Sequence, residues 1–147
     1  MLGDAHVSKA FISTLPRSGD ADLSARVAVG WTKDALKVRV EVTDDQHCPE
    51  RDYTHAYKGD SLQLYFDPFN DALPGHPNTD DDVEYAFTLQ NDGTVSRWLE
   101  KGAEGNFKGE ANQRDKLIDP DVKAEITRAG TRTIYEISLP RETCLPG

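Results

Sequence analysis

Apolar and polar residues alternate along most of the chain, and this alternation is its strongest structural signal. The stretch LKVRVEVT at residues 36–43 puts leucine and valine on one face of a strand and charged or hydroxyl side chains on the other. The same period of two returns at residues 27–31, 62–66, 83–89, 122–126 and 135–139, with turn residues between these segments. A period of two indicates a half-buried β-strand. The pattern therefore predicts an all-β fold, an antiparallel, jelly-roll-like β-sandwich of two packed sheets.

The alternation also predicts the core of this sandwich. Trp31 alternates with Val27 and Val29, so we expect it to be buried. In the strand at residues 83–89 we expect Ala86 and Thr88 on the polar face, opposite the apolar positions. The spacing of Trp98 fits either face. The residues expected to fill the core are Val38, Val40, Leu62, Leu64, Phe66, Tyr85, Phe87 and Ile137.

Length and charge narrow the class of protein. The 147 residues fit one domain, residues 1–147, that needs no disulfide to bury a core. A net charge of -9 disfavours nucleic acid and anionic membranes as partners, because their phosphates would repel the protein. No apolar run approaches the ~20 residues of a membrane helix, and the N-terminal residues lack a signal-peptide pattern. Cys48 and Cys144 form no C-x-x-C pair; we expect two free thiols, with one disulfide as the alternative.

An acidic, Gly- and Pro-rich loop separates the strands expected at residues 62–66 and 83–89. Calcium takes about six to eight oxygen ligands, and a bent acidic loop supplies many of them; the alternative is a solvated loop. The residues expected to hold calcium are Asp67, Asp80, Asp81 and Asp82. His47 and His55 have no third ligand at a diagnostic spacing, so we expect them to be exposed loop histidines.

Two tyrosines are candidates for a ligand platform. Tyr53 and Tyr57 lie in the polar segment before the strand at residues 62–66, outside any alternating apolar face. An exposed ring suits sugar binding, because pyranose C–H groups stack on an aromatic face. The alternative is that Tyr57 packs as an ordinary residue at the start of a strand. The sequence has no G-x-S-x-G, H-E-x-x-H or phosphate-loop motif, so we expect no enzymatic activity.

Three segments together resemble carbohydrate-binding module family 9 and its family-9-like relatives. They are VAVGWTKDALKVRVEVTDD (residues 27–45), YKGDSLQLYFDP (57–68) and NTDDDVEYAFTLQNDGTV (78–95). The most specific pieces are W-x(4)-L-x-V-x-V-x-V-x-D, the aromatic-x-x-D-S start of a strand, and the triple aspartate before a strand. The resemblance covers about residues 25–139. It implies an antiparallel β-sandwich with structural calcium and a slot in which two aromatic rings clamp a sugar at a chain end.

The resemblance also assigns expected roles to individual residues. Tyr57 falls where the family has one clamp tryptophan, Gln63 where it has a sugar-binding glutamate, and Ala86 where it has a sugar-binding arginine. Tyr53 is a further sugar-binding candidate beside them. The second clamp ring belongs to C-terminal strands that would follow residue 139. The chain is therefore expected either to be a fragment of a larger protein that lacks those strands, or to have other segments in their place.

The function that the resemblance implies is that of a noncatalytic accessory module. Its ligand would be a mono- or oligosaccharide or a polysaccharide chain end, and its covalent partner a catalytic domain such as a glycoside hydrolase in an extracellular or periplasmic bacterial protein. One alternative is a structural spacer or protein-interaction sandwich that has lost sugar binding. Another is a haem-binding relative, which is disfavoured because Met1 is the only methionine available as an axial ligand.

Overall fold

The computed structural model describes residues 3–7, 19–50, 53–71, 82–102, 105–106 and 121–144. Within these ranges lie strands, one 3₁₀-helix, η1, and one short α-helix, α2. No helix among them is long and apolar enough to cross a membrane. The elements are β1 (Gly3–Val7), β2 (Leu23–Trp31), β3 (Ala35–Asp44), η1 (Tyr53–Lys58), β4 (Leu62–Phe66), β5 (Val83–Leu89), β6 (Val95–Gly102), β7 (Gly105–Asn106), β8 (Lys123–Ala129), β9 (Arg132–Pro140) and α2 (Arg141–Cys144).

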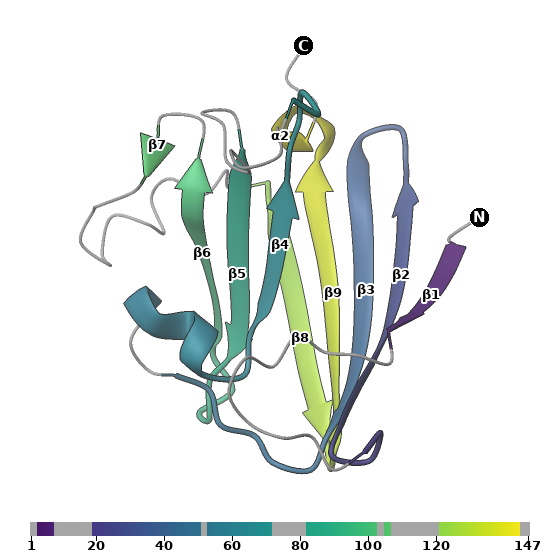
Figure 1. Cartoon of the computed structure of the whole chain (residues 1–147), viewed down its shortest axis with the longest axis vertical. Helices are drawn as coiled ribbons and strands as arrows, with labels where there is room; N and C mark the ends of the chain where they lie inside the picture. Colours follow the sequence, from purple (N-terminus) through teal and green to yellow (C-terminus); the bar gives the residue numbers. More distant parts are fainter. Residues whose placement is uncertain are drawn as a thin grey trace.

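The strands form two antiparallel sheets that pack face to face (Figure 1). The larger sheet has the order β1-β2-β3-β9-β8, and the smaller sheet has the order β4-β5-β6-β7. The main contacts between the sheets run from β5 and β6 to β8. This arrangement confirms the predicted β-sandwich.

The register of the central strands explains why alternation in the sequence becomes a core. In the larger sheet, Val38 of β3 lies opposite Val29 of β2 and Ile137 of β9. In the smaller sheet, Leu64 of β4 lies opposite Tyr85 of β5. Side chains that face each other across a ladder share one side of the sheet, so the apolar rows of both sheets meet in the middle.

The predicted core is confirmed, and the burial of its residues decreases toward β4. Val38, Val40, Tyr85, Phe87 and Ile137 are all buried. The three predicted core residues of β4, which are Leu62, Leu64 and Phe66, are partly buried and pack against that cluster. They are less buried because β4 forms an edge of the smaller sheet.

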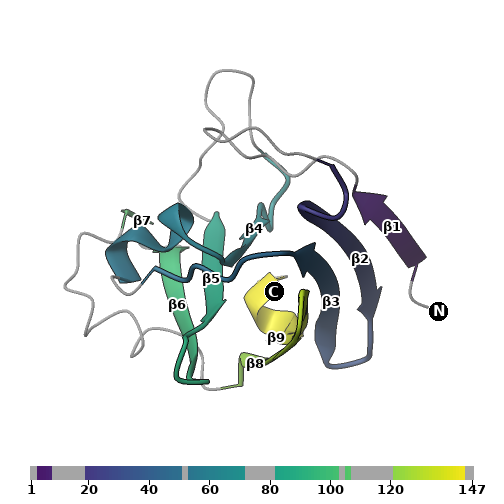
Figure 2. The same cartoon turned by 90° about the horizontal axis from the view of Figure 1, so that it is seen from below.

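The prediction that Trp31 is buried is wrong. Trp31 pairs with Leu36 and so lies on the inner side of the larger sheet, yet its side chain is 53% exposed. Figure 2 shows the reason: the smaller sheet stands against β8 and β9, while β2 and β1 extend beyond it. At this position, therefore, the inward face of β2 has no second layer over it.

The prediction of a polar outer face for β5 is also wrong. Ala86 and Thr88 are as buried as the core residues on the other side of the strand, and Trp98 of β6, which pairs with Ala86, is buried too. Figures 1 and 2 place η1 beside β5 and β6, on the side away from β9. Ala56 of η1 belongs to the same buried cluster, so this short helix covers part of the outer side of the smaller sheet.

Candidate functional site

Tyr57 lies on η1, the short helix over the smaller sheet, and its side chain is 64% exposed. The Nζ atom of Lys58 stands 5.7 Å from the centre of the Tyr57 ring, a cation–π distance. Tyr53 begins η1, and its side chain lies outside the described part of the structure.

Gln63 belongs to β4 and points to the same side of the smaller sheet as η1. Its cross-strand partner is Ala86, which in turn pairs with Trp98, so the three side chains share one side of the sheet. Gln63 is exposed, whereas Ala86 and Trp98 are buried. The structure therefore brings Gln63 and the helix of Tyr57 to the same layer, and it leaves only a buried methyl group at Ala86.

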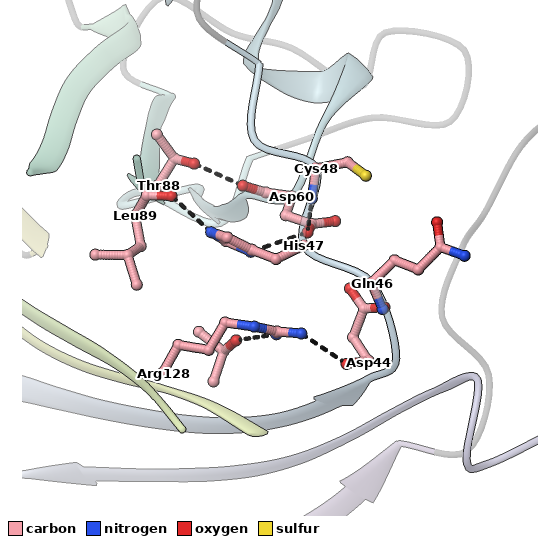
Figure 3. A network of polar contacts seen from close by, with 9 residues as sticks. Asp44, Gln46, His47, Cys48, Asp60, Thr88, Leu89 and Arg128 are labelled. Atoms are coloured by element: carbon pink, nitrogen blue, oxygen red, sulfur yellow. Dashed lines mark hydrogen bonds and ion pairs between the residues drawn. The ribbon is translucent and has the colours of Figure 1, made fainter. Parts of the chain in front are cut away.

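A network centred on Asp60 joins η1 to the loop that precedes it (Figure 3). The Oδ2 atom of Asp60 accepts a hydrogen bond from the backbone N–H of Cys48 at 2.7 Å, and the N–H of Asp60 donates to the carbonyl of Cys48 at 3.1 Å. Thr88 Oγ1 donates to the Asp60 carbonyl at 2.6 Å, which ties the turn to β5. Ser61 Oγ donates to the Ala56 carbonyl at 3.0 Å and closes the end of η1.

The prediction that His47 is an exposed loop histidine is wrong. Its side chain is only 15% exposed. Nδ1 lies 3.1 Å from Asp60 Oδ2, and Nε2 lies 2.9 Å from the carbonyl oxygen of Leu89. These partners are 13 and 42 residues away in the chain, so no local pattern reveals them. The Asp-Ser pair at the start of β4 is the sequence signal that marks the network. His55 has its side chain outside the described residues.

Asp44 and Arg128 close the lower part of the same network. Arg128 donates from Nη2 to the Asp44 carbonyl at 2.8 Å and from Nη1 to Thr133 Oγ1 at 2.7 Å. The carboxylate of Asp44 accepts a hydrogen bond from the N–H of Gln46 at 3.0 Å. Burial raises the pKa of Asp44, and the nearby charge of Asp60 adds to that rise. The end of the sandwich below η1 is therefore a hydrogen-bonded polar cluster with both signs of charge.

The described residues contain only part of the predicted calcium site. Asp80 and Asp81 lie outside the described residues. Asp82 is fully buried, and its Oδ2 accepts a hydrogen bond from the hydroxyl of Tyr65 at 2.8 Å. Asp67 accepts a hydrogen bond from the N–H of Asp71 at 3.2 Å. Among the described side chains, no three of His, Cys, Asp or Glu converge in a way that would hold a metal ion.

A hollow of about 310 Å³ lies on the opposite side of the molecule, on the outer face of the larger sheet. None of the predicted sugar-binding residues lines it. Glu41 in its wall forms ion pairs with Arg39 and Arg132, and these two guanidinium groups lower the pKa of the Glu41 carboxyl. The lining residues are Ser24, Ala25, Arg26, Glu41, Thr43 and Arg132.

Comparison with known proteins decides the family. Residues 4–146 match the family described as Carbohydrate family 9 binding domain-like. The chain belongs to this family. The match runs over nearly the whole sequence and confirms the resemblance in the sequence. No curated protein matches the chain.

Two solved structures of carbohydrate binding module family 9 (CBM9) from Caldicellulosiruptor kristjanssonii share the fold. The one in complex with cellotriose is 15% identical with a TM-score of 0.53, and it aligns with 84% of this chain and 51% of its own. The one in complex with glucose is 16% identical with a TM-score of 0.52, and it aligns with 85% of this chain and 55% of its own. The family 9-like chain thus spans about half the length of these structures.

Proposed function

We propose that this family 9-like chain is a noncatalytic module that binds sugar on the exposed ring of Tyr57. The observation that carries the proposal is that η1 presents this ring to solvent while its own end is pinned to the smaller sheet. A rigid ring loses little conformational freedom when it stacks on a pyranose. Gln63, exposed on the same side of the sheet, has an amide that donates to and accepts from sugar hydroxyls.

The context of the module is part of the same proposal. Family membership supports a sugar ligand, either a mono- or oligosaccharide or the end of a polysaccharide chain. The module would be covalently attached to a catalytic domain in an extracellular bacterial protein such as a glycoside hydrolase. One tyrosine offers a shallow platform, so we expect a Kd on the order of micromolar to millimolar, or about -8 to -4 kcal/mol.

Titration of the chain with glucose and cellotriose, followed by amide NMR shifts, tests the proposal. We expect shift changes at η1 and β4, and we expect Tyr57→Ala to abolish them. Phe69→Ala is the matched control, because Phe69 is 62% exposed and lies outside η1. Sugar shifts that persist in Tyr57→Ala, or that vanish equally in Phe69→Ala, would remove Tyr57 from the site.

Calcium is a second component of this proposal. Asp67 and Asp82 stand at the two ends of the loop that also carries Asp80 and Asp81, and a cation there would offset the repulsion among these carboxylates. Bound calcium would stabilise the fold by mass action, by about 2.7 kcal/mol at a hundredfold excess over its Kd. Identical melting curves in calcium and in a chelator would contradict it.

A protein-interaction module is the second candidate function, and one observation favours it. Trp31 and Val29 are exposed together on the uncovered inner side of β2. Exposed apolar groups of this kind occur at protein interfaces. If the chain binds no sugar, and Trp31→Ala abolishes association with the remainder of its parent protein, this second function replaces the first.

A further inference from the structure

Two exposed side chains follow one another along the outer face of β4. Gln63 and Tyr65 are two residues apart, so they point to the same side of the smaller sheet, and both are exposed. This is the side on which η1 lies with the ring of Tyr57 (Figures 1 and 2). Figure 1 shows β4 running away from the end of η1, so Gln63 comes first along the strand and Tyr65 second.

Tyr65 has its hydroxyl held while its ring is in water. The hydroxyl donates a hydrogen bond to Oδ2 of Asp82 at 2.8 Å, and Asp82 is fully buried. A tyrosine at a protein surface ordinarily packs its ring and turns its hydroxyl to water. Because the hydroxyl of Tyr65 points to a buried carboxylate instead, its exposed surface belongs largely to the ring. A ring fixed in this way loses little conformational freedom when a ligand stacks on it.

A carboxylate lies beside this ring. Glu84 of β5 is the cross-strand partner of Tyr65, so the two side chains share one side of the sheet, and Glu84 is half-buried. After desolvation and the hydrogen bond to Asp82, the charge of Glu84 also raises the pKa of Tyr65, which places this carboxylate near the phenol. Carboxylate oxygens accept hydrogen bonds from hydroxyl groups. An exposed ring with such an acceptor beside it matches a pyranose, which has an apolar C–H face and hydroxyl donors at its rim.

We propose that Tyr65 and Glu84 form a second sugar subsite, the β4 subsite, and that the ligand of this module is therefore an oligosaccharide. The sugar chain would run from the ring of Tyr57 past Gln63 to Tyr65. Alternate residues of a strand are about 7 Å apart, so a sugar unit that stacks on Tyr57 and bonds to Gln63 leaves Tyr65 to the next unit. This inference rests on the proposed function, because it extends the same platform along β4.

The parent chain tests the β4 subsite by its preference between two sugars. Amide NMR titrations with glucose and with cellotriose give both affinities. We expect cellotriose to bind about two- to tenfold more tightly, which corresponds to the contribution of one further aromatic contact. Both sugars should shift the amides of η1, and only cellotriose should also shift those of Tyr65 and Glu84. Equal affinities for the two sugars would overturn the proposal.

Substitutions at Tyr65 separate a sugar contact from a structural role. Tyr65→Ala should remove the preference for cellotriose and leave the affinity for glucose unchanged, whereas a purely structural role would lower both affinities together. Tyr65→Phe keeps the ring and should retain more of the preference than Tyr65→Ala; an equal loss in both would contradict stacking on the ring. Phe69→Ala is the matched control, because Phe69 is also exposed but lies outside β4 and should leave the preference intact.

Glu84→Gln keeps the shape of the side chain and tests the acceptor without changing Tyr65. It should weaken cellotriose binding more than glucose binding. If Tyr65→Ala does not fold, this variant and Tyr65→Phe still decide the question. An unchanged preference for cellotriose in both would overturn the β4 subsite.

Titration of Tyr57→Ala distinguishes this inference from the proposed function. If that variant loses both sugars while Tyr65→Ala loses only the preference for cellotriose, both proposals hold. If Tyr57→Ala binds as the parent does and Tyr65→Ala does not bind, the Tyr57 platform is rejected and the β4 subsite stands. Glucose binding without a preference for cellotriose in the parent would reject the β4 subsite alone. Absence of binding of either sugar to the parent would reject both.

Discussion

Gly59 lies so close to Glu50 that a Cβ atom on Gly59 would stand 2.3 Å from the backbone nitrogen of Glu50. The same Cβ would lie 2.6 Å from the carbonyl oxygen of Cys48. Both obstacles are backbone atoms, which cannot move aside as the end of a side chain can. The turn after η1 therefore requires glycine for steric reasons.

Replacement of Gly59 with alanine should destabilise the protein by about 1–3 kcal/mol or more, because the added methyl group overpacks a fixed backbone contact. Chemical denaturation at neutral pH measures the loss. Gly130→Ala is the control, since Gly130 has a φ of 58° but no atom near its virtual Cβ. Backbone strain alone should cost about 1 kcal/mol there. If Gly59→Ala lowers the free energy of unfolding no more than Gly130→Ala does, the backbone at Cys48 and Glu50 can move to accommodate the methyl group.

Truncation of core side chains should follow the burial gradient across the smaller sheet. Phe87 is completely buried on the central strand β5, and Phe87→Ala should cost about 3–5 kcal/mol. Leu64 is only partly buried on the edge strand β4, so Leu64→Ala should cost about 2 kcal/mol, at the low end for leucine. Urea unfolding of both variants tests the order. A Leu64→Ala loss under about 0.5 kcal/mol would mean that the register of β4 is misassigned.

The two cysteines should differ sharply in reactivity. Cys48 is exposed and Cys144 is buried, and both are free thiols, which confirms the expectation from the sequence. Burial raises the pKa of Cys144 to about 11, which keeps its thiol protonated at neutral pH. A disulfide reagent such as DTNB should label one thiol quickly and the second only as the protein unfolds. The Cys48→Ser variant should lose the fast phase; two fast phases in the parent would place Cys144 at the surface.

Tyr65 and Asp82 should make the protein sensitive to alkali. Tyr65 is 46% exposed, and the partial desolvation of its hydroxyl, followed by the hydrogen bond to Asp82, raises the pKa of Tyr65 to about 12. The folded state thus favours the neutral phenol, so its contribution is full below about pH 10 and is lost as the pH rises through 12. Spectrophotometric titration of tyrosinate should show one fewer late-titrating group in Tyr65→Phe. That variant should also be less stable by about 1–3 kcal/mol, because a buried carboxylate loses a donor.

Strands could be predicted from the sequence because their alternation is a local property. The layer that covers each face of a strand could not be predicted from the sequence. Trp31 and Val38 lie on the same side of the larger sheet, yet only Val38 has the smaller sheet above it. Ala86 lies on the outer side of β5, where alternation predicts exposure to water, yet it is fully buried and belongs to the same cluster as Ala56 of η1. Burial at these positions depends on how far one layer extends over another, which no single strand encodes.

In the candidate site, too, some features could be predicted from the sequence and others could not. The exposure of Tyr57 agrees with an aromatic in a polar segment, and Gln63 lies on the predicted face of its strand. The hydrogen bonds that hold the turn after η1 could not be predicted, because Asp60 contacts His47 and Cys48 in one part of the chain and Thr88 in another. Short polar motifs such as the Asp-Ser pair mark such networks without indicating their partners.

The pairing of β3 with β9 has a consequence for how the protein folds. Lys37 of β3 donates a hydrogen bond to Ser138 of β9, which lies 101 residues further along the chain. All strands of the smaller sheet are encoded between these two strands. The middle of the larger sheet can therefore form only after a long loop has closed, at an entropic cost that local contacts do not offset. We expect slow folding, on the timescale of milliseconds to seconds, and exposed strand edges until β9 inserts.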